Sequence, residues 1–297
     1  ETPPFPAVRR KDQKLFRGPG VDLGGEPGFP QTWLFLFWPK NFRDPPLWFP
    51  MIYFFILATI LVYLIGERIF HERRLRRIPI RIHVNGTRGK SSVTRLIAAA
   101  LQKNGIRTLA KTTGTKAVWI LPDGREEMIR RRGPARIQEQ MHMVQKAEAL
   151  KARAIVVECM ALDPFLQEVS EARMIQSTVG VITNVRPDHF EVMGRNLEEI
   201  AESLSQTLPR NGTLITADRK FWRYFQDEAV PRGTKVILAH AEGEKFPATP
   251  LGDNVLAARE VCSLLGFPPS SVPDSLPGSL AGRGEPGILW VERGGKR

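Results

Sequence analysis

The spacing of hydrophobic positions changes near residue 78 of this 297-residue chain. Residues 47–66 read LWFPMIYFFILATILVYLIG, a run without a charged side chain. Because a helix of about 20 residues crosses the core of a bilayer, this run predicts a transmembrane anchor. A buried core helix or a cleaved signal peptide fits less well, since the run is long and far from the first residue. Residues 1–46 are rich in Pro and Gly and predict an irregular extension.

After the anchor, short apolar runs alternate with segments of helical composition. Strands are predicted at residues 81–85, 107–111, 154–158, 178–184, 213–216 and 235–239, with a hairpin at 117–129. Helices are predicted at residues 91–104, 135–152, 164–174, 218–228 and 254–265, and another begins at Asn196. The alternation predicts an α/β fold over residues 78–266, a mostly parallel sheet with helices on both faces. Residues 267–297 are rich in Pro and Gly and predict a tail.

Arginines are concentrated directly after the apolar run. Six follow it against Glu67 and Glu72: Arg68, Arg73, Arg74, Arg76, Arg77 and Arg81. Because positive loops stay inside, this excess predicts a single-pass protein of the cell membrane with its larger domain in the cytoplasm. The same cluster suits the anionic headgroups of membrane lipid.

The formal net charge of +12 has a second source in Arg130, Arg131, Arg132 and Arg136. Such a cluster is a solvated face, a membrane-surface patch or a site for a polyanionic substrate. Nucleic acid is not expected as a partner, because no helix-turn-helix, zinc or RNA-binding pattern accompanies the charge. The two cysteines, at 159 and 262, form no disulfide framework, which fits a reducing compartment.

Residues 84–92 read VNGTRGKSS between a predicted strand and a predicted helix. This arrangement cradles nucleotide phosphates, because backbone N–H groups and a helix N-terminus face the anion and Lys90 adds a positive charge. Ser91 is placed to give its hydroxyl to magnesium. The usual phosphate-loop pattern has Gly where Val84 stands, so the match is incomplete. The alternative is a chance Gly-Lys-Ser at a helix start.

Polar residues also follow other predicted strands, at the edge where ligands bind in such sheets. The sequence Thr-Thr-Gly-Thr occupies residues 112–115, and Glu158 ends the run AIVVE. A buried carboxylate needs a cation nearby, so Glu158 is expected to bind magnesium or to pair with an arginine. Asn184, Asp188 and His189 follow TVGVITN. Alone, His189 would be a loop histidine without a special role.

Six motifs in order carry a resemblance: VNGTRGKSS, KTTGT, RRGPARIQEQ, VVECMALDP, GVITNVRPDHFEVMG and LPRNGTLITAD. Over about residues 78–266 the chain resembles the ligase subunit of bacterial poly-γ-glutamate (capsule) synthase, of the Mur ligase-like superfamily. The resemblance implies a central-domain-like P-loop fold and an ATP-binding ligase domain. It also implies glutamate and poly-γ-glutamate as substrates and other membrane subunits of a synthase or export complex as partners.

In this family ATP phosphorylates a carboxylate, and the amine of glutamate attacks the acyl phosphate. The resemblance implies that the nucleotide contacts Gly86, Thr87, Arg88, Gly89, Lys90, Ser91, Ser92 and Asn184. It implies Mg²⁺ ligands at Ser91, Thr113, Glu158 and His189, with His189 at a second ion. Lys90, Glu158 and His189 would be catalytic, and Arg131, Arg132 and Arg136 would contact the substrate.

Two departures from the family qualify these expectations. Many relatives carry a carbamylated lysine in the helix after the histidine, whereas residues 196–208 contain no Lys. The family's C-terminal domain would begin after residue 265, so it is expected to be missing or supplied by another subunit. The alternatives are another Mur-like ligase, of folylpolyglutamate or peptidoglycan type, and a non-catalytic membrane-anchored nucleotide-binding subunit.

Overall fold

The computed structural model describes residues 48–114, 117–131, 133–240 and 250–273. The chain divides into two units, residues 1–60 and 61–297. The predicted N-terminal extension lies outside the described residues.

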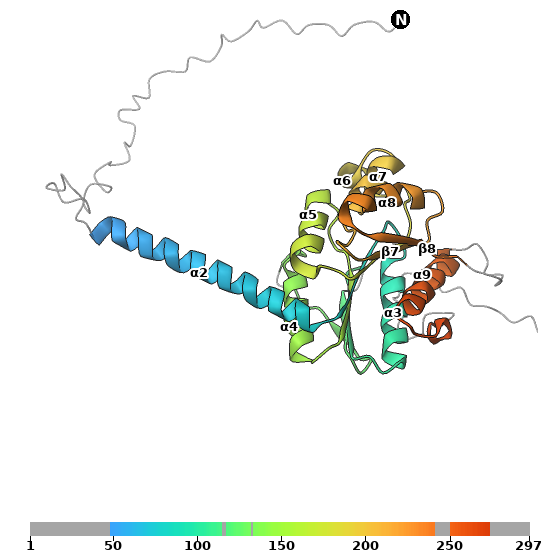
Figure 1. The fold of residues 1–297 in the computed structure, drawn as a ribbon, viewed down its shortest axis with the longest axis horizontal. Coiled ribbons are helices and arrows are strands. Elements are labelled where there is room, and N and C mark those ends of the chain that lie inside the picture. Colours follow the sequence, from blue (N-terminus) through green and yellow to red (C-terminus); the bar gives the residue numbers. More distant parts are fainter. Residues whose placement is uncertain (1–47, 115–116, 132, 241–249, 274–297) are drawn as a thin grey trace, which may run out of the picture. The chain divides into compact units, whose positions relative to one another are not determined.

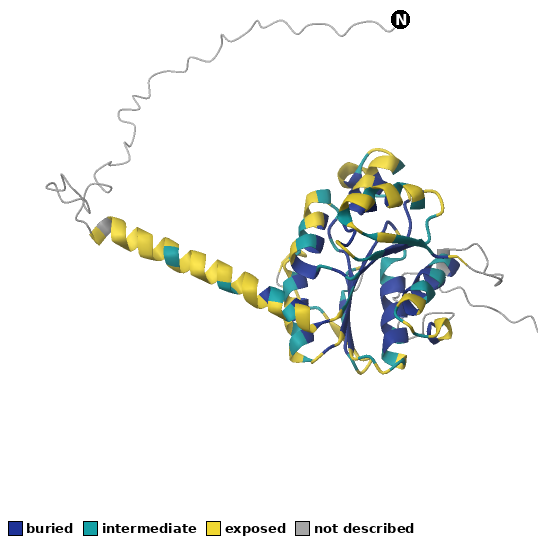
Figure 2. Ribbon diagram, in the orientation of Figure 1, coloured by how far each residue is buried: buried dark blue, intermediate teal, exposed yellow. Residues whose placement is uncertain are grey.

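Helix α2 (Trp48–Arg77) contains the predicted anchor and continues beyond it. Within the described residues it is the one helix long and apolar enough to cross a membrane, with a mean hydropathy of 1.9 over its most apolar window. No residue of that window is buried, and Figure 2 shows the helix exposed along most of its length. Its length and apolar surface are those of a membrane-spanning helix.

The end of α2 belongs to the second unit and bonds to other residues of that unit. His71 Nε2 lies 2.9 Å from the carbonyl oxygen of Met174, and Arg74 and Arg77 both bond to Glu148. The helix stops just before Pro79, because proline disfavours helical backbone in the preceding residue. Arg81 Nη1 then donates to the carbonyl oxygens of Leu75 and Ile78, which satisfies acceptors at the helix end.

The described residues form one eight-stranded sheet in the order β4-β3-β2-β5-β1-β6-β7-β8. The strands are β1 (Ile80–Asn85), β2 (Thr108–Thr112), β3 (Val118–Ile120), β4 (Glu126–Met128), β5 (Ala154–Glu158), β6 (Val179–Ile182), β7 (Thr213–Thr216) and β8 (Lys235–Leu238). Strand β1 pairs in parallel with both β5 and β6, while β2–β3 and β3–β4 are antiparallel. The predicted fold and the predicted hairpin are confirmed.

Helices cover both faces of the sheet (Figure 1). Helices α3 (Lys90–Lys103) and α9 (Pro250–Leu264) pack together on one face. The opposite face carries α4 (Glu139–Ala149), α5 (Pro164–Val169), the π-helix η1 (Ser170–Ile175), α7 (Leu197–Ser205) and α8 (Trp222–Ala229). The short helix α6 (Phe190–Met193) contacts α7, and two 3₁₀ turns are η2 (Val230–Arg232) and η3 (Pro269–Ser271).

Side chains along β5 alternate between the two faces of the sheet. Ala154 and Val156 are buried on the α3 face, and Ile155 and Val157 on the α4 face. Because successive residues of a strand point to opposite faces, Glu158 follows Ala154 and Val156 toward α3. The alternation along the strand therefore points the Glu158 carboxylate toward α3, whose first residue is Lys90.

Several helix boundaries differ from the prediction for local reasons. Helix α8 begins at Trp222 instead of residue 218, because the Asp218 carboxylate accepts the N–H groups of Lys220 and Phe221 in a turn. The helix predicted at 135–152 begins only at Glu139, and α9 begins at Pro250, ahead of the predicted start. The packed core also extends to Val272, past the predicted boundary at 266.

Candidate functional site

The phosphate loop joins β1 to α3 and depends on two glycines. Gly86 has φ +128° and Gly89 has φ +83°, in the region that favours glycine. A Cβ at Gly86 would overlap Thr183, and one at Gly89 would meet the side-chain amide of Asn254. The loop is therefore packed against β6 and α9, which leaves no room for a side chain at either glycine.

Thr87 and Asn184 hold the loop in shape through one another. Thr87 Oγ1 donates to Asn184 Oδ1 at 2.7 Å, and the Arg88 N–H donates to the same oxygen at 3.2 Å. Asn184 Nδ2 returns a bond to the Arg88 carbonyl oxygen at 3.0 Å. Both side chains are buried. Asn184 thus contacts the loop backbone, a positioning role that the sequence prediction did not specify.

Lys90 is the first residue of α3 and folds back over the loop. Its Nζ donates to the carbonyl oxygens of Gly86 at 2.7 Å and Thr87 at 3.3 Å. The ammonium group therefore lies within the loop, at the positive end of a 14-residue helix. This combination of a cation and a helix N-terminus is suited to phosphate oxygens.

Ser91, Glu158 and the loop after β2 converge beside Lys90. Ser91 Oγ donates to Glu158 Oε2 at 2.9 Å, and the Thr113 N–H donates to the same oxygen at 2.7 Å. Thr113 thus reaches Glu158 through its backbone. A Cβ on Gly114 would lie 2.9 Å from Ser91 Oγ, so this loop packs closely over the serine.

Glu158 is buried, with 3% of its surface exposed, and among the described residues no arginine or lysine forms an ion pair with it. The predicted alternative of an arginine salt bridge is therefore not observed. A buried carboxylate held only by neutral donors is costly without a cation. One hydroxyl and one carboxylate are hard oxygen ligands, the kind that Mg²⁺ takes together with water and phosphate oxygens. The residues present fit that ion.

His189 lies on the loop after β6, in left-handed backbone conformation with φ +48°. Its neighbour Asp188 pairs with Arg88 of the phosphate loop at 3.1 Å, and the His189 ring lies 3.8 Å from Asp188 and 3.6 Å from Glu191. Among the described residues no three His, Cys, Asp or Glu side chains gather as a metal site. The second magnesium at His189 stays a prediction.

The three predicted substrate arginines have different surroundings. Arg131 forms a two-bond pair with Glu139, at 2.6 and 3.0 Å, so its guanidinium is engaged. Arg132 lies outside the described residues. Arg136 is exposed and lines a cavity of about 680 Å³ together with Trp119, Arg130 and His142.

Glu139 also binds a buried lysine that sequence analysis missed. Lys111 Nζ lies 3.0 Å from Glu139 Oε2, and the lysine side chain is fully buried. Burial lowers the pKa of Lys111, an effect that the Glu139 carboxylate opposes. Burial would raise the pKa of Glu139, but the bonds from Arg131 and Lys111 outweigh it and hold that pKa at about 2. The one sign of this network in the sequence is Lys111, a charged residue in a predicted strand directly before Thr-Thr-Gly-Thr.

Asn254 and Asp218 were also missed. Asn254 is buried near the start of α9, against Gly89. The Asp218 carboxylate accepts the Val185 N–H at 2.8 Å and so orients the segment after Asn184. A buried polar residue at a helix start was the available signal for Asn254, whereas nothing in the sequence places Asp218 beside residue 185.

A glycine loop, a lysine at a helix N-terminus and a serine bonded to a strand-end glutamate define a phosphate-binding α/β domain. The model of the Mur ligase middle domain matches residues 84–258, and the chain belongs to this family. It is 38% identical over 253 residues to the capsule biosynthesis protein CapB of Bacillus anthracis, covering 82% of this chain and 54% of that protein. It is 37% identical to the PGA synthase CapB of Bacillus subtilis strain 168, covering 79% and 61%.

The chain thus spans less than two thirds of the length of these two relatives. Among solved structures it resembles a bifunctional folylpolyglutamate synthase/dihydrofolate synthase with Mn, AMPPNP and L-glutamate bound. That match has a TM-score of 0.52 and 15% identity and covers 73% of this chain and 61% of the other. E. coli FolC in complex with DHPP and ADP gives a TM-score of 0.50 at 14% identity, covering 69% and 59%. These likenesses support the fold.

Proposed function

We propose that this chain is an ATP-dependent amide ligase that activates a carboxylate as an acyl phosphate and adds glutamate to poly-γ-glutamate. The proposal is supported by membership of the Mur ligase family and by relatives named for capsule biosynthesis and PGA synthesis. The observation that carries it is the pair of Ser91 Oγ and Glu158 Oε2, 2.9 Å apart beside Lys90. This geometry supplies what phosphoryl transfer needs, a phosphate cradle next to a place for a cation.

In the proposed reaction a carboxylate oxygen of the acceptor attacks the terminal phosphorus of ATP, and ADP leaves. The amine nitrogen of glutamate then attacks the acyl carbon, so that an amide forms, phosphate leaves and the nitrogen loses a proton. Lys90 and the N-terminus of α3 would hold the phosphates and oppose the charge that develops on the transferring oxygens. Magnesium, when bound at Ser91 and Glu158, would add a cation to the same charge.

The acceptor would approach from the cavity beside α4. Arg136 and Arg130 line this cavity, and their side chains form no hydrogen bond or ion pair within the described residues. Arginine binds carboxylates with two parallel bonds, and γ-linked glutamate carries a carboxylate on each residue. Arg131 would act indirectly by fixing Glu139 and the segment around it. Arg132 belongs to the same proposal by sequence alone.

The proposed location is the cell membrane, with α2 as a single anchor, lipid around it and the chain from Arg68 onward in the cytoplasm beside other membrane subunits. Both native cysteines are buried, so a reporter cysteine can be read without background. Lys103 is exposed at the end of α3 and suits the reporter. A membrane-impermeant thiol reagent applied to intact cells should leave K103C unlabelled. Labelling from outside would contradict the topology.

Membranes that hold the full chain test the proposed reaction, with and without neighbouring membrane subunits. Glutamate-dependent release of ADP and incorporation of labelled glutamate into polymer are expected, and hydroxylamine should trap the acyl phosphate. ADP release that depends instead on a folate or a peptidoglycan precursor would assign the chain to another Mur-like ligase. Nucleotide binding without turnover in every combination would assign it to a non-catalytic subunit.

A further inference from the structure

The edge of the sheet opposite the phosphate loop contains a second polar cavity, of about 440 Å³. Its walls come from the amino ends of the parallel strands: Arg81 in β1, Thr178 before β6, Arg210 before β7 and Arg232 before β8. Helix α5 and the π-helix η1 supply Glu168 and Glu171. The phosphate loop follows the carboxyl end of β1, so the cavity is separate from the proposed ligase site.

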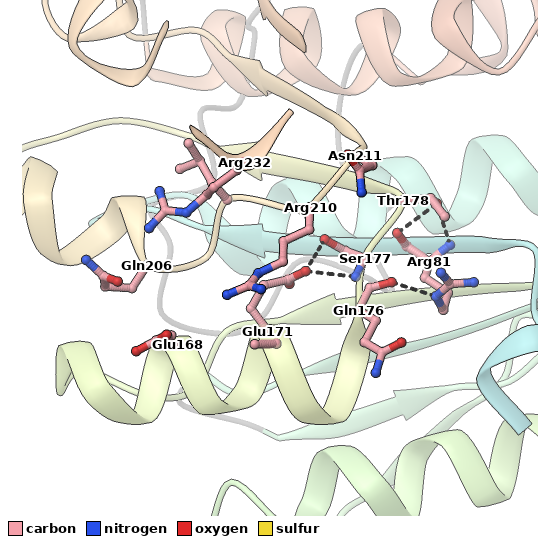
Figure 3. Close-up of a pocket in the computed structure, with 12 residues that line it drawn as sticks. Arg81, Glu168, Glu171, Gln176, Ser177, Thr178, Gln206, Arg210, Asn211 and Arg232 are labelled. Carbon is pink, nitrogen blue, oxygen red and sulfur yellow. Dashed lines mark hydrogen bonds between the residues drawn. The ribbon is translucent and has the colours of Figure 1, made fainter. Parts of the chain in front are cut away.

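The floor of this cavity is rigid and internally bonded. Arg81 donates to three carbonyl oxygens, those of Gln176, Leu75 and Ile78. Glu171 accepts two bonds from Ser177, both 2.8 Å, and one from His83 Nδ1 at 2.8 Å, as Figure 3 shows in part. The Arg81 guanidinium and the Glu171 carboxylate are thus bonded within the protein.

The mouth carries charges that the protein leaves available. The side chains of Arg210 and Glu168 are exposed and form no hydrogen bond or ion pair within the described residues. Among the described residues the Arg232 guanidinium contacts only Glu228, its carbonyl oxygen at 3.3 Å and its carboxylate at 3.9 Å. In Figure 3 Arg210 and Arg232 come from the β7–β8 side, and Glu168 lies across from them on α5.

We propose that this cavity is a second ligand site, for a small acidic amino acid that carries two carboxylates and one ammonium group. Apart from Arg81 and Glu171, which bond within the floor, its charged lining is Arg210, Arg232 and Glu168, a surplus of one positive charge that matches the single negative charge of such a ligand. Arg210 and Arg232 receive the carboxylates, and Glu168 receives the ammonium group. The amides of Gln206 and Asn211 lie on the same lining and offer further hydrogen bonds. Cavities of about 300–1,000 Å³ hold small ligands.

A simple anion is the less suitable occupant, because Glu168 would repel it. An amino acid can bind the arginines through its carboxylates and Glu168 through its ammonium group. The ligand class follows from the lining, whereas the choice of glutamate as the probe rests on the proposed function. Glutamate bound here would link the α5–η1 segment to the β7 and β8 connections, away from the reacting atoms.

Calorimetric titration of the full chain in nanodiscs, without ATP, tests the site. The probes are both enantiomers of glutamate, and glutarate, which lacks the ammonium group. R210Q should weaken glutamate binding at this site by about tenfold, the loss of one charge-assisted bond. E168Q should also weaken glutamate binding but strengthen glutarate binding. R173Q is the matched control, because Arg173 is an exposed arginine of η1 that does not line the cavity.

Circular dichroism melting checks that each variant is folded, as expected for the exposed Arg210, Glu168 and Arg173 and for the half-buried Arg232. Unchanged glutamate binding in R210Q, R232Q and E168Q would overturn the second site. Stronger binding of glutamate in E168Q would replace the amino acid with a simple anion. A chain that binds glutamate at this site but never releases ADP would contradict only the proposed ligase function, so the two failures are distinguishable.

Discussion

Glu158 and Glu139 are two carboxylates of the same domain with different kinds of bonding partner. Glu158 is 3% exposed, and within the described part of the chain it accepts bonds from two neutral donors, the Ser91 hydroxyl and the Thr113 N–H. Glu139 receives two cations, Arg131 and Lys111. The difference shows where charge is left for a ligand. Glu139 is paired with two cations, whereas among the described residues no lysine or arginine forms an ion pair with Glu158, which lies beside the phosphate loop.

The largest expected effect comes from Lys90→Ala on the Glu158 side. Removal of a cation from the developing phosphoryl charge should lower ligation by about 100- to 1,000-fold. The measurement is glutamate-dependent ADP release by membranes that hold the full chain. Lys103→Ala, an exposed lysine at the other end of α3, is the matched control and should keep activity. Equal activity in the two variants would remove Lys90 from the reaction.

Glu158→Gln tests whether the Glu158 carboxylate binds magnesium. The variant keeps the shape of the side chain but removes its charge, so the magnesium concentration at half-maximal activity should rise by about tenfold or more. The melting temperature should hold or increase, because an uncompensated buried charge is lost. A large fall in melting temperature with an unchanged magnesium curve would make Glu158 a structural residue.

Glu139→Gln should show the reverse pattern. It leaves the buried Lys111 without its carboxylate, which should cost about 1–3 kcal/mol of unfolding free energy. The magnesium dependence of activity should stay the same. Chemical denaturation of the two glutamine variants side by side measures the contrast. If Glu139→Gln instead shifts the magnesium curve and spares stability, the two carboxylates have exchanged roles.

The pH dependence of stability sharpens the same contrast. The folded pKa of Glu139 is about 2, below its ordinary value of 4.5, so this carboxylate stabilises the fold above pH 4.5. That contribution is lost as the pH falls from about 4.5 toward 2, because over this range the unfolded state takes up a proton that the folded state does not yet bind. The difference in unfolding free energy between the native chain and Glu139→Gln should shrink over this range. A difference that stays constant would contradict the ion-pair network.

The surroundings of Glu158 follow from local features of the sequence. Lys90 and Ser91 are adjacent in the motif that joins β1 to α3, and the alternation of side chains along β5 points Glu158 toward α3. The Glu139 side depends on contacts distant in sequence, since Lys111 ends up beside residue 139 only when α4 packs on the sheet. The predicted helix also began before Glu139, which hid the role of that residue as the acidic opening of α4. The left-handed backbone of His189 has no signal in the sequence.

The smallest expected effect is a difference in acceptor kinetics between substitutions of Arg136 and Arg131. Arg136 is exposed on the cavity beside α4, while Arg131 is engaged by Glu139. Arg136→Gln should therefore raise the Michaelis constant for acceptor polymer a few-fold, since an exposed ion pair is worth about 0.2–1 kcal/mol. The constant for ATP should not change, and added salt should reduce the difference between variant and native chain, because exposed charges are screened.

Arg131→Gln is the comparison within the same segment. It should lower the free energy of unfolding, because the pair with Glu139 is broken. Any rise in the Michaelis constant for acceptor polymer should accompany this loss of stability. Steady-state kinetics with polymer of one length, together with vesicle binding, compares the two variants. If Arg136→Gln changes only the binding to anionic vesicles, the segment contacts lipid. If both variants alter acceptor kinetics equally without loss of stability, Arg131 contacts the substrate directly and its pair with Glu139 opens during turnover.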